Sequence, residues 1–274
     1  MSSDDASSSW PGAGTDPPRD IDTGVPQSAR IWNYWLGGKN NYPVDRAAGD
    51  EVLRVYPRMP DAARAARHFI ARVVRHLVAE AGIRQFLDVG TGLPTVDNTH
   101  EIAQRAAPEC KVVYVDNDPL VLAHARALLT SSPEGVTVYV DADLHDPETI
   151  LREAGRTLDF GRPTALMLMG ILGHIDHDVA LTIVPRLMAG LPSGSYLGIY
   201  DFTDTGAGVK EAERLYEESG TLPYHPRPLE KIAALFQGLE PVPPGVVEVS
   251  RWRPDPSPLP QTPVDVAGGV ARKP

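Results

Sequence analysis

Gln85-Phe86-Leu87-Asp88-Val89-Gly90-Thr91-Gly92-Leu93-Pro94-Thr95 is the stretch that decides the fold. In its first half Phe86, Leu87 and Val89 make a short apolar run, as expected of a buried strand. Gly90-Thr91-Gly92 then permits a sharp turn and brings bare backbone close to a ligand, because glycine adopts such conformations without steric cost. Asp88 comes at the strand end, where α/β sheets place their ligands. The alternative is an ordinary strand-to-helix turn that happens to contain two glycines.

The next predicted strand, residues 111–115, is followed by Asp116 and Asn117. An acidic residue about 20 residues beyond a glycine turn is where a nucleoside's ribose hydroxyls are held. Asp116 could instead be a solvated turn residue or a helix N-cap. However, Asp118-Pro119 already supplies a helix start. We therefore expect Asp116, with Asn117 beside it, to bind a nucleoside.

The glycine turn also indicates which nucleoside cofactor binds. A dinucleotide site has a third glycine, and that position is Thr95 here. Pro94 in addition removes a backbone N–H from the turn that would hold a pyrophosphate. The turn therefore suits a ligand without phosphates, such as S-adenosylmethionine, although a nicotinamide-dependent oxidoreductase on a similar fold remains the rival interpretation.

The Asp-x-Gly-x-Gly turn and the acidic end of the second strand resemble the first two motifs of class I methyltransferases. Residues 26–42, 45–48 and 82–95 together are similar to a family of bacterial S-adenosylmethionine-dependent methyltransferases formerly catalogued as a domain of unknown function, and the similarity runs from about 25 to about 254. It implies an α/β, Rossmann-like, seven-stranded sheet that is mostly parallel and closed by a C-terminal antiparallel hairpin. It also implies S-adenosyl-L-methionine as cofactor, and it leaves the acceptor open. A protein that binds this cofactor or its demethylated product without turnover is a second alternative.

Composition narrows the class of protein. The chain has 274 residues, of which 42% are hydrophobic, and a formal net charge of −10. Acidic charge argues against non-specific nucleic-acid binding, which depends on Lys and Arg. The single cysteine, Cys110, excludes an intramolecular disulfide and a cysteine-rich metal site. Without a membrane-length apolar run or a typical secretory signal, we expect a cytoplasmic protein acting on a small molecule, with no membrane or nucleic-acid partner.

The chain divides into four predicted parts: a disordered tail over 1–24, an N-terminal helical extension over 25–82, the cofactor-binding domain over 83–254 and a Pro-rich unfolded tail over 255–274. Within the domain, apolar strands alternate with helices, which predicts a parallel sheet covered on both faces. The expected strands are 85–89, 111–115, 136–140, 164–169, 195–200, 238–241 and 246–252. The expected helices are 45–56, 61–81, 97–106, 119–129, 147–154, 177–190, 207–218 and 228–237.

The extension contains an aromatic-rich segment, residues 26–42, that ends at Gly37-Gly38 and a polar loop. It is either a packing helix or a lid over the cofactor, since aromatics stack on flat ligands and glycines permit loop movement. In the lid interpretation Tyr34 contacts the cofactor. Four arginines of the following helix, at 64, 67, 72 and 75, are expected on its solvated face.

The remaining cofactor contacts come from the resemblance. It implies that Asp143 and Leu144, at the end of the third strand, border the adenine. It also implies that Met169 and Gly170, at the end of the fourth strand, line the methyl-donor pocket.

His174 lies just beyond the fourth strand, and we predict that it is the general base, because an imidazole titrates near neutral pH. With Asp176, His177 and Asp178 it could also form a metal site. A polar loop that caps a helix is the interpretation we favour, and no metal is expected.

Overall fold

The computed structural model describes residues 21–95, 97–128, 131–256 and 262–274. These residues form one eight-stranded sheet in the order β3-β2-β1-β4-β5-β8-β6, with β7 also paired to β8. The first five strands are parallel, and β8 runs antiparallel to β5. The strands are β1 (Gln85–Val89), β2 (Lys111–Asp116), β3 (Val136–Asp141), β4 (Ala165–Met169), β5 (Tyr196–Phe202), β6 (Glu240–Pro241), β7 (Val247–Glu248) and β8 (Val266–Arg272). The predicted α/β class, with mostly parallel strands and antiparallel C-terminal strands, is confirmed.

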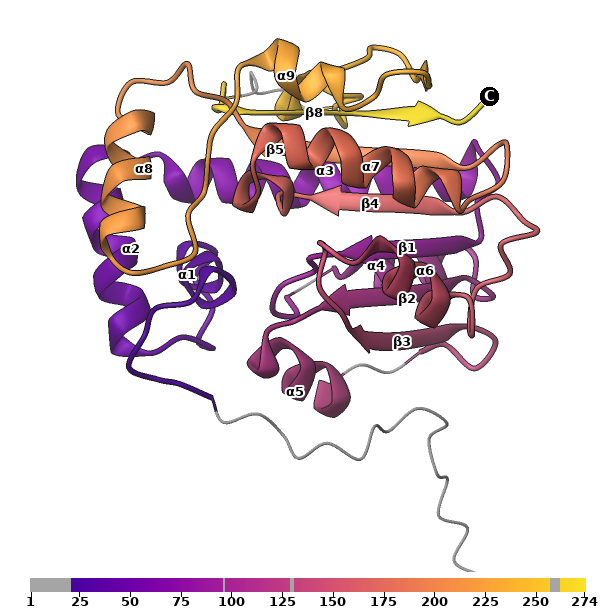
Figure 1. Ribbon diagram of the computed structural model, residues 1–274, viewed down its shortest axis with the longest axis horizontal. Helices are drawn as coiled ribbons and strands as arrows, with labels where there is room; N and C mark the ends of the chain where they lie inside the picture. The colour runs from indigo at the N-terminus through magenta and orange to yellow at the C-terminus, as the bar shows by residue number, and fades with distance from the viewer. Residues whose placement is uncertain (1–20, 96, 129–130, 257–261) are drawn as a thin grey trace, which may run out of the picture.

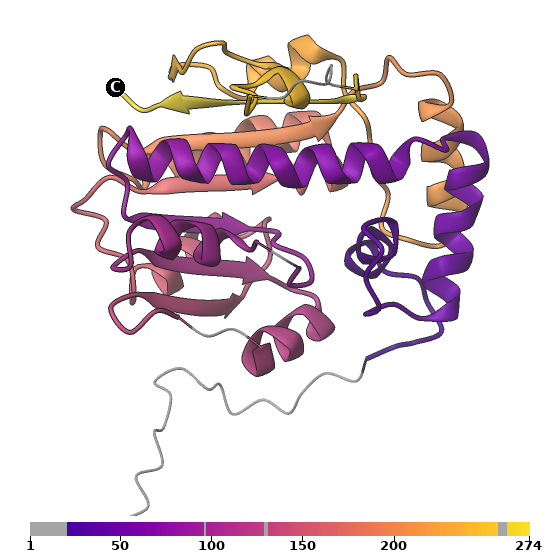
Figure 2. The ribbon, with the colours of Figure 1, turned by 180° about the vertical axis from the view of Figure 1, so that it is seen from behind.

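Helices cover both faces of the sheet (Figures 1 and 2). They are α1 (Ser28–Trp35), α2 (Pro43–Val55), α3 (Met59–Ala79), α4 (Thr99–Ala106), α5 (Pro119–Leu128), α6 (Pro147–Ala154), α7 (His177–Ala189), α8 (Val209–Glu218) and α9 (Leu229–Ala234), with 3₁₀ turns η1 (Leu172–His174) and η2 (Val249–Arg251). Strand residues alternate between two cores, as pleating requires. Phe86 joins the core under α3 and α4, and Leu87 joins the one under α6 and α7.

The site lies where the strand order reverses. The chain crosses from the β1–β2–β3 side to the β4–β5 side, so β1 and β4 are neighbours whose carboxyl ends open side by side. In such sheets, ligands bind in the crevice at this point.

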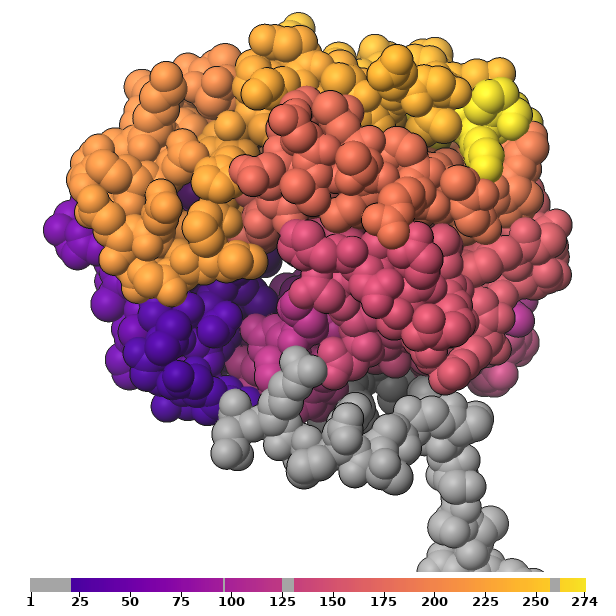
Figure 3. All heavy atoms as spheres, viewed as in Figure 1, coloured from indigo at the N-terminus to yellow at the C-terminus, as the bar shows by residue number. Residues whose placement is uncertain are grey.

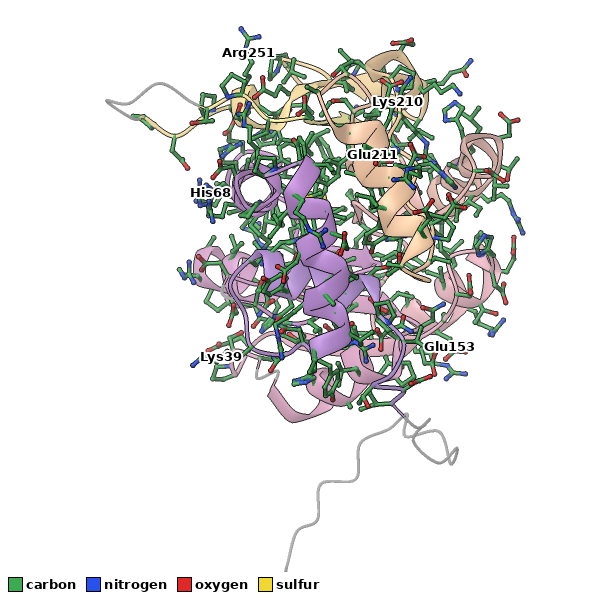
Figure 4. All side chains as sticks on the ribbon, turned by 90° about the vertical axis from the view of Figure 1, so that its left-hand side faces the viewer. Lys39, His68, Glu153, Lys210, Glu211 and Arg251 are labelled. Atoms are coloured by element: carbon green, nitrogen blue, oxygen red, sulfur yellow. The ribbon has the colours of Figure 1, made fainter. Side chains whose placement is uncertain are left out.

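Three helices stand beyond the carboxyl ends of the parallel strands: α1, α2 and α8 (Figure 1). Figure 4 faces this wall and shows α2 and α8 side by side. Gly208 makes the close approach possible, because a Cβ there would lie 2.3 Å from the carbonyl oxygen of Val55. The predicted helical extension therefore packs against a segment far along the chain and stands opposite the strand ends.

The C-terminal segment corrects the prediction of an unfolded tail over 255–274. Residues 266–272 form β8, which pairs with β5, β6 and β7. The strands near 240 and 247 therefore pair with β8 and do not form a hairpin with each other. Prolines dominate the segment before it, whereas Val266, Ala267 and Val270 are buried. Residues 257–261, and residues 1–20 of the predicted N-terminal tail, lie outside the described residues.

The arginines of α3 give a second correction. Arg72 is only 8% exposed, and it donates hydrogen bonds to the carbonyls of Trp252 at 2.9 Å and Val249 at 2.6 Å. Arg67 lines the cavity described below. Their partners are nearly two hundred residues away or in another loop, so helical periodicity cannot distinguish them from solvated arginines. Across the described residues, none of the helices has the length and hydropathy needed to cross a membrane.

Candidate functional site

The glycine turn after β1 has the conformation that the sequence predicts. Gly90 and Gly92 have φ values of +74° and +66°, which disfavour any residue with a Cβ. At Gly90 a Cβ would also lie 2.4 Å from Cγ1 of Ile171, in the turn after β4. The two turns are therefore packed against each other, and their backbones form one surface at the strand ends.

Asp116 is tied to this turn. One carboxylate oxygen accepts the Gly92 N–H at 2.9 Å, and the other accepts the Asp118 N–H at 3.0 Å. Burial raises the pKa of Asp116 to about 6, against the lowering effect of these backbone donors. Each oxygen keeps a further lone pair, so the oriented carboxylate can still accept hydrogen bonds from a ligand.

Asp88, beside it, is 6% exposed and accepts a 2.7 Å hydrogen bond from the Thr99 hydroxyl. Burial raises its pKa to about 6, while the Thr99 bond and the charge of Arg67 act in the opposite direction. Asp88 therefore also positions the start of α4, a role that the sequence did not indicate.

The turn after β4, like the turn after β1, contains a glycine with a positive φ. Gly170 has a φ of +84°, its N–H donates to the Tyr200 carbonyl at 3.0 Å, and a Cβ there would lie 2.8 Å from the Tyr200 ring. Any larger residue would displace Tyr200. Met169 precedes it and is buried.

His174 ends η1, immediately beyond this turn. Its Nδ1 lies 2.8 Å from the carbonyl oxygen of Pro223, which can only accept, so Nδ1 carries the hydrogen and Nε2 is the basic nitrogen. Burial lowers the pKa of His174, although the bond to Pro223 raises it. The imidazole is therefore neutral at neutral pH and can accept a proton.

These residues line one cavity of about 250 Å³. Figure 3 shows a hollow between the N-terminal segment and the strand ends at this place. From the sheet side, the cavity is lined by the predicted residues Asp88, Gly90, Thr91, Gly92, Asp116, Asn117, Met169, Gly170 and His174. From the opposite wall it is lined by residues of α1, α2 and α8, among them Trp32, Trp35, Val52, Ala212, Glu213 and Tyr216.

Three predicted site residues lie elsewhere. Tyr34 does not line the cavity; its hydroxyl donates to Asp50 at 2.6 Å, because its side of α1 faces α2. Leu144 is buried in the core under α6 and α7. Asp143 is about half exposed, with a side-chain value of 53%, and accepts a 3.2 Å hydrogen bond from Asn117, which does line the cavity.

Across the described residues, no group of three or more His, Cys, Asp and Glu side chains is arranged to hold a metal ion. Asp176 and Asp178 are exposed beside the start of α7.

Comparison with known proteins decides the family. Residues 14–274 match the model of a family described as S-adenosyl methyltransferase. The chain belongs to this S-adenosyl methyltransferase family. Its cofactor is S-adenosyl-L-methionine, which removes the nicotinamide alternative.

Solved structures of similar proteins agree with this family. A DUF574 family protein from Streptomyces avermitilis is 46% identical, with a TM-score of 0.88 over 93% of this chain and 100% of that one. A candidate methyltransferase from Thermobifida fusca is 40% identical, with a TM-score of 0.85 over 95% of this chain and 99% of that one. The mitomycin 7-O-methyltransferase MmcR shares the fold at 16% identity, with a TM-score of 0.50 over 89% of this chain and 67% of that one. No curated protein matches the chain.

The polar groups of this site fit S-adenosylmethionine. A buried carboxylate with free lone pairs suits two ribose hydroxyls, and two positive-φ glycines leave the backbone of the turn open. The chain also offers one guanidinium: Arg67 is the only Lys or Arg among the described residues that line the cavity.

Proposed function

We propose that this S-adenosyl methyltransferase transfers a methyl group to a small-molecule acceptor held between the strand ends and the helical wall. The observation that carries the proposal is that the ribose candidate Asp116 and the base candidate His174 line the same cavity. At one end of the cavity Asp116 can hold a nucleoside, and at the other end His174 can take a proton.

Asp116 would hold the ribose, and the backbone of Gly90, Thr91 and Gly92 would lie along the methionine end. Arg67 is the natural partner of the methionine carboxylate, because guanidinium and carboxylate pair in a forked geometry. Arg67 also donates to the Asp97 carbonyl at 2.8 Å, which ties it to the loop after the glycine turn.

When bound, S-adenosylmethionine supplies a methyl group on a positively charged sulfur, which departs as a neutral thioether. The acceptor's oxygen or nitrogen forms the new bond to carbon, and His174 Nε2 takes the acceptor's proton. The protein's main contribution is to hold the two reactants in line, which is worth several kcal/mol.

The experiment is methyl transfer from a radiolabelled donor into the small-molecule fraction of a cell extract. His174→Gln should reduce transfer about 100-fold, as expected for loss of a general base, while S-adenosylhomocysteine binding persists. His68→Gln is the matched control, because His68 lies exposed on α3 and points outward in Figure 4. Cofactor binding without transfer to any fraction would indicate a binding protein without turnover, and transfer into macromolecules alone would contradict the small-molecule acceptor.

A further inference from the structure

The half of the cavity beyond the turn after β4 is walled by aromatic rings from different elements. Trp32 of α1 meets Phe202 of β5 edge-to-face, with ring centroids 6.1 Å apart. Phe202 meets Tyr224 at 5.7 Å, and Tyr224 meets His174 at 4.9 Å, again edge-to-face. All four residues line the cavity, so a continuous row of rings leads from the helical wall to His174. We call this row the aromatic wall.

The aromatic wall is held in place from behind. Tyr224 donates its hydroxyl hydrogen to Asp201, which also pairs with Arg227, and both charged residues are buried. Arg227 further donates to the Leu172 carbonyl of η1 at 2.7 Å. Gly173 leaves room for the ring, since a Cβ there would lie 2.3 Å from Tyr224 Cζ. The ring position is therefore set before a ligand arrives, which lowers the ordering cost of binding.

Few charged side chains line this half of the cavity. Its described lining contains no Lys or Arg, since Arg67 belongs to α3 beside Asp88, and its one carboxylate is Glu213 of α8. Glu213 lies 3.1 Å from His225 Nδ1, and the His225 N–H donates to the Gly173 carbonyl at 2.8 Å. An anionic ligand here would lose its hydration without gaining a cation, which is costly. A flat uncharged ring would instead bury its faces against aromatic side chains.

We infer that the aromatic wall binds an uncharged, planar aromatic acceptor whose hydroxyl or amino group faces His174. This rests on the proposed function and adds the substrate class. The acceptor's oxygen or nitrogen uses a lone pair to form the bond to the methyl carbon, the carbon–sulfur electron pair stays on sulfur, and the acceptor's proton passes to His174 Nε2. Each atom and charge is thereby accounted for, and no oxidant or reductant is needed.

The test measures binding to the full chain saturated with S-adenosylhomocysteine, by thermal shift and tryptophan fluorescence. The probes are 1-naphthol and 1-naphthylamine as uncharged rings, 1-naphthoate as the matched anion, and cyclohexanol as a non-aromatic alcohol. The uncharged rings should bind at least about ten-fold more tightly than 1-naphthoate and cyclohexanol. Equal binding of 1-naphthoate and 1-naphthol, or no binding of either uncharged ring, would overturn the inference.

Two variants sharpen the result. Trp32→Leu keeps apolar volume and removes a ring, so 1-naphthol affinity should fall about ten-fold while S-adenosylhomocysteine affinity is kept. Tyr34→Leu is its control on the same helix, because Tyr34 does not line the cavity. Glu213→Lys introduces a cation, and 1-naphthoate binding should then rise about ten-fold. Unchanged probe binding in both Trp32→Leu and Glu213→Lys would overturn the inference, whereas failure of the unmodified protein to bind S-adenosylhomocysteine would overturn the proposed function itself.

Discussion

The carboxylate of Asp116 accepts a 2.9 Å hydrogen bond from the backbone N–H of Gly92. This bond joins the two halves of the sequence motif, because it ties the end of β2 to the glycine turn after β1. The same carboxylate thereby shapes the turn and offers its free lone pairs to the cavity.

Removing the Asp116 carboxylate should weaken cofactor binding. Asp116→Ala is expected to reduce S-adenosylhomocysteine affinity by about 1.5–3 kcal/mol, the range for a hydrogen bond to a charged group. Calorimetry measures the loss. Asp141→Ala is the control, because Asp141 is the neighbouring residue in register on β3 and is exposed. Unchanged affinity in a folded Asp116→Ala protein would reject the ribose assignment.

Cofactor affinity should depend on pH near 6. Burial raises the pKa of both Asp116 and Asp88 to about 6, so below that pH they become neutral and Asp116 is a poorer acceptor for hydroxyl hydrogens. S-adenosylhomocysteine affinity should rise from pH 5 to pH 7 and then level off. Binding at pH 6 should release protons, which calorimetry in buffers of different ionisation enthalpy detects, and Asp116→Asn should flatten the profile.

The contribution of Asp116 and Asp88 to the stability of the ligand-free protein should fall with rising pH, whereas cofactor affinity should rise. A carboxyl whose pKa is raised by folding binds its proton more tightly in the folded state than in the unfolded state. Its contribution to the free energy of unfolding is therefore fully present below the unfolded pKa and is lost as pH rises toward 6. Asp116→Asn should therefore gain relative stability above pH 6. Urea unfolding of both proteins at pH 5 and pH 7 checks the sign, and a larger relative gain at pH 5 would contradict it.

The glycine at position 90 should tolerate no side chain. Gly90→Ala adds positive-φ strain of about 1–2 kcal/mol and also a clash with Ile171. Gly82→Ala separates the two effects, because Gly82 has a φ of +69° and open space around its Cβ position. Chemical denaturation should show Gly90→Ala as the more destabilised variant, and equal losses would mean that the contact between the two turns carries no energy.

The segment 26–42 should tighten when cofactor binds, as the lid hypothesis requires. Ala29 of α1 lines the cavity and packs against the cluster of Leu93, Leu120 and Val121 beside the glycine turn, so bound cofactor adds contacts to α1. Its far side is already anchored, because buried Arg30 donates to buried Asp45 at 3.0 Å. Hydrogen exchange with and without S-adenosylhomocysteine should show slower exchange in residues 28–35. Equal protection in both states, with slowing at 86–95, would leave α1 as a packing helix only.

The buried ion pair Asp201–Arg227 behind the aromatic wall should contribute far more to the free energy of unfolding than an exposed ion pair. Arg227→Met removes the cation that pairs with buried Asp201, which costs about 3–5 kcal/mol. Arg214→Met, which breaks exposed contacts to Glu211 and Glu218, should change the free energy of unfolding far less, because solvent screens exposed ion pairs. Thermal or denaturant unfolding compares the two, and similar losses would show that Asp201 is compensated in another way.

Short-range sequence patterns predicted the residues that line the cavity from the strand ends. The strand at 85–89 and the helix at 147–154 have the predicted bounds, because periodicity and Pro or Gly at the ends are properties of neighbouring residues. Residues at or directly after the ends of the parallel strands β1 and β2, such as Asp116 and Gly90, meet at one edge because parallel strands end together. Asp143 and Tyr34 do not line the cavity, because their side-chain directions depend on local partners, His145 and Asp50.

The sequence by itself determined the α/β sheet and a cofactor without phosphates, and it predicted which strand-end residues line the cavity, since each depends on short-range pattern. Only the tertiary structure decided what faces them. Tyr56 donates to Asp265, 209 residues away, at 2.7 Å, and Arg72 reaches Trp252, 180 residues away. Contacts of that separation place α2, α3 and β8, and with them the wall of the cavity. No local pattern encodes them, because their energy comes from packing surfaces that meet only when the whole chain has folded.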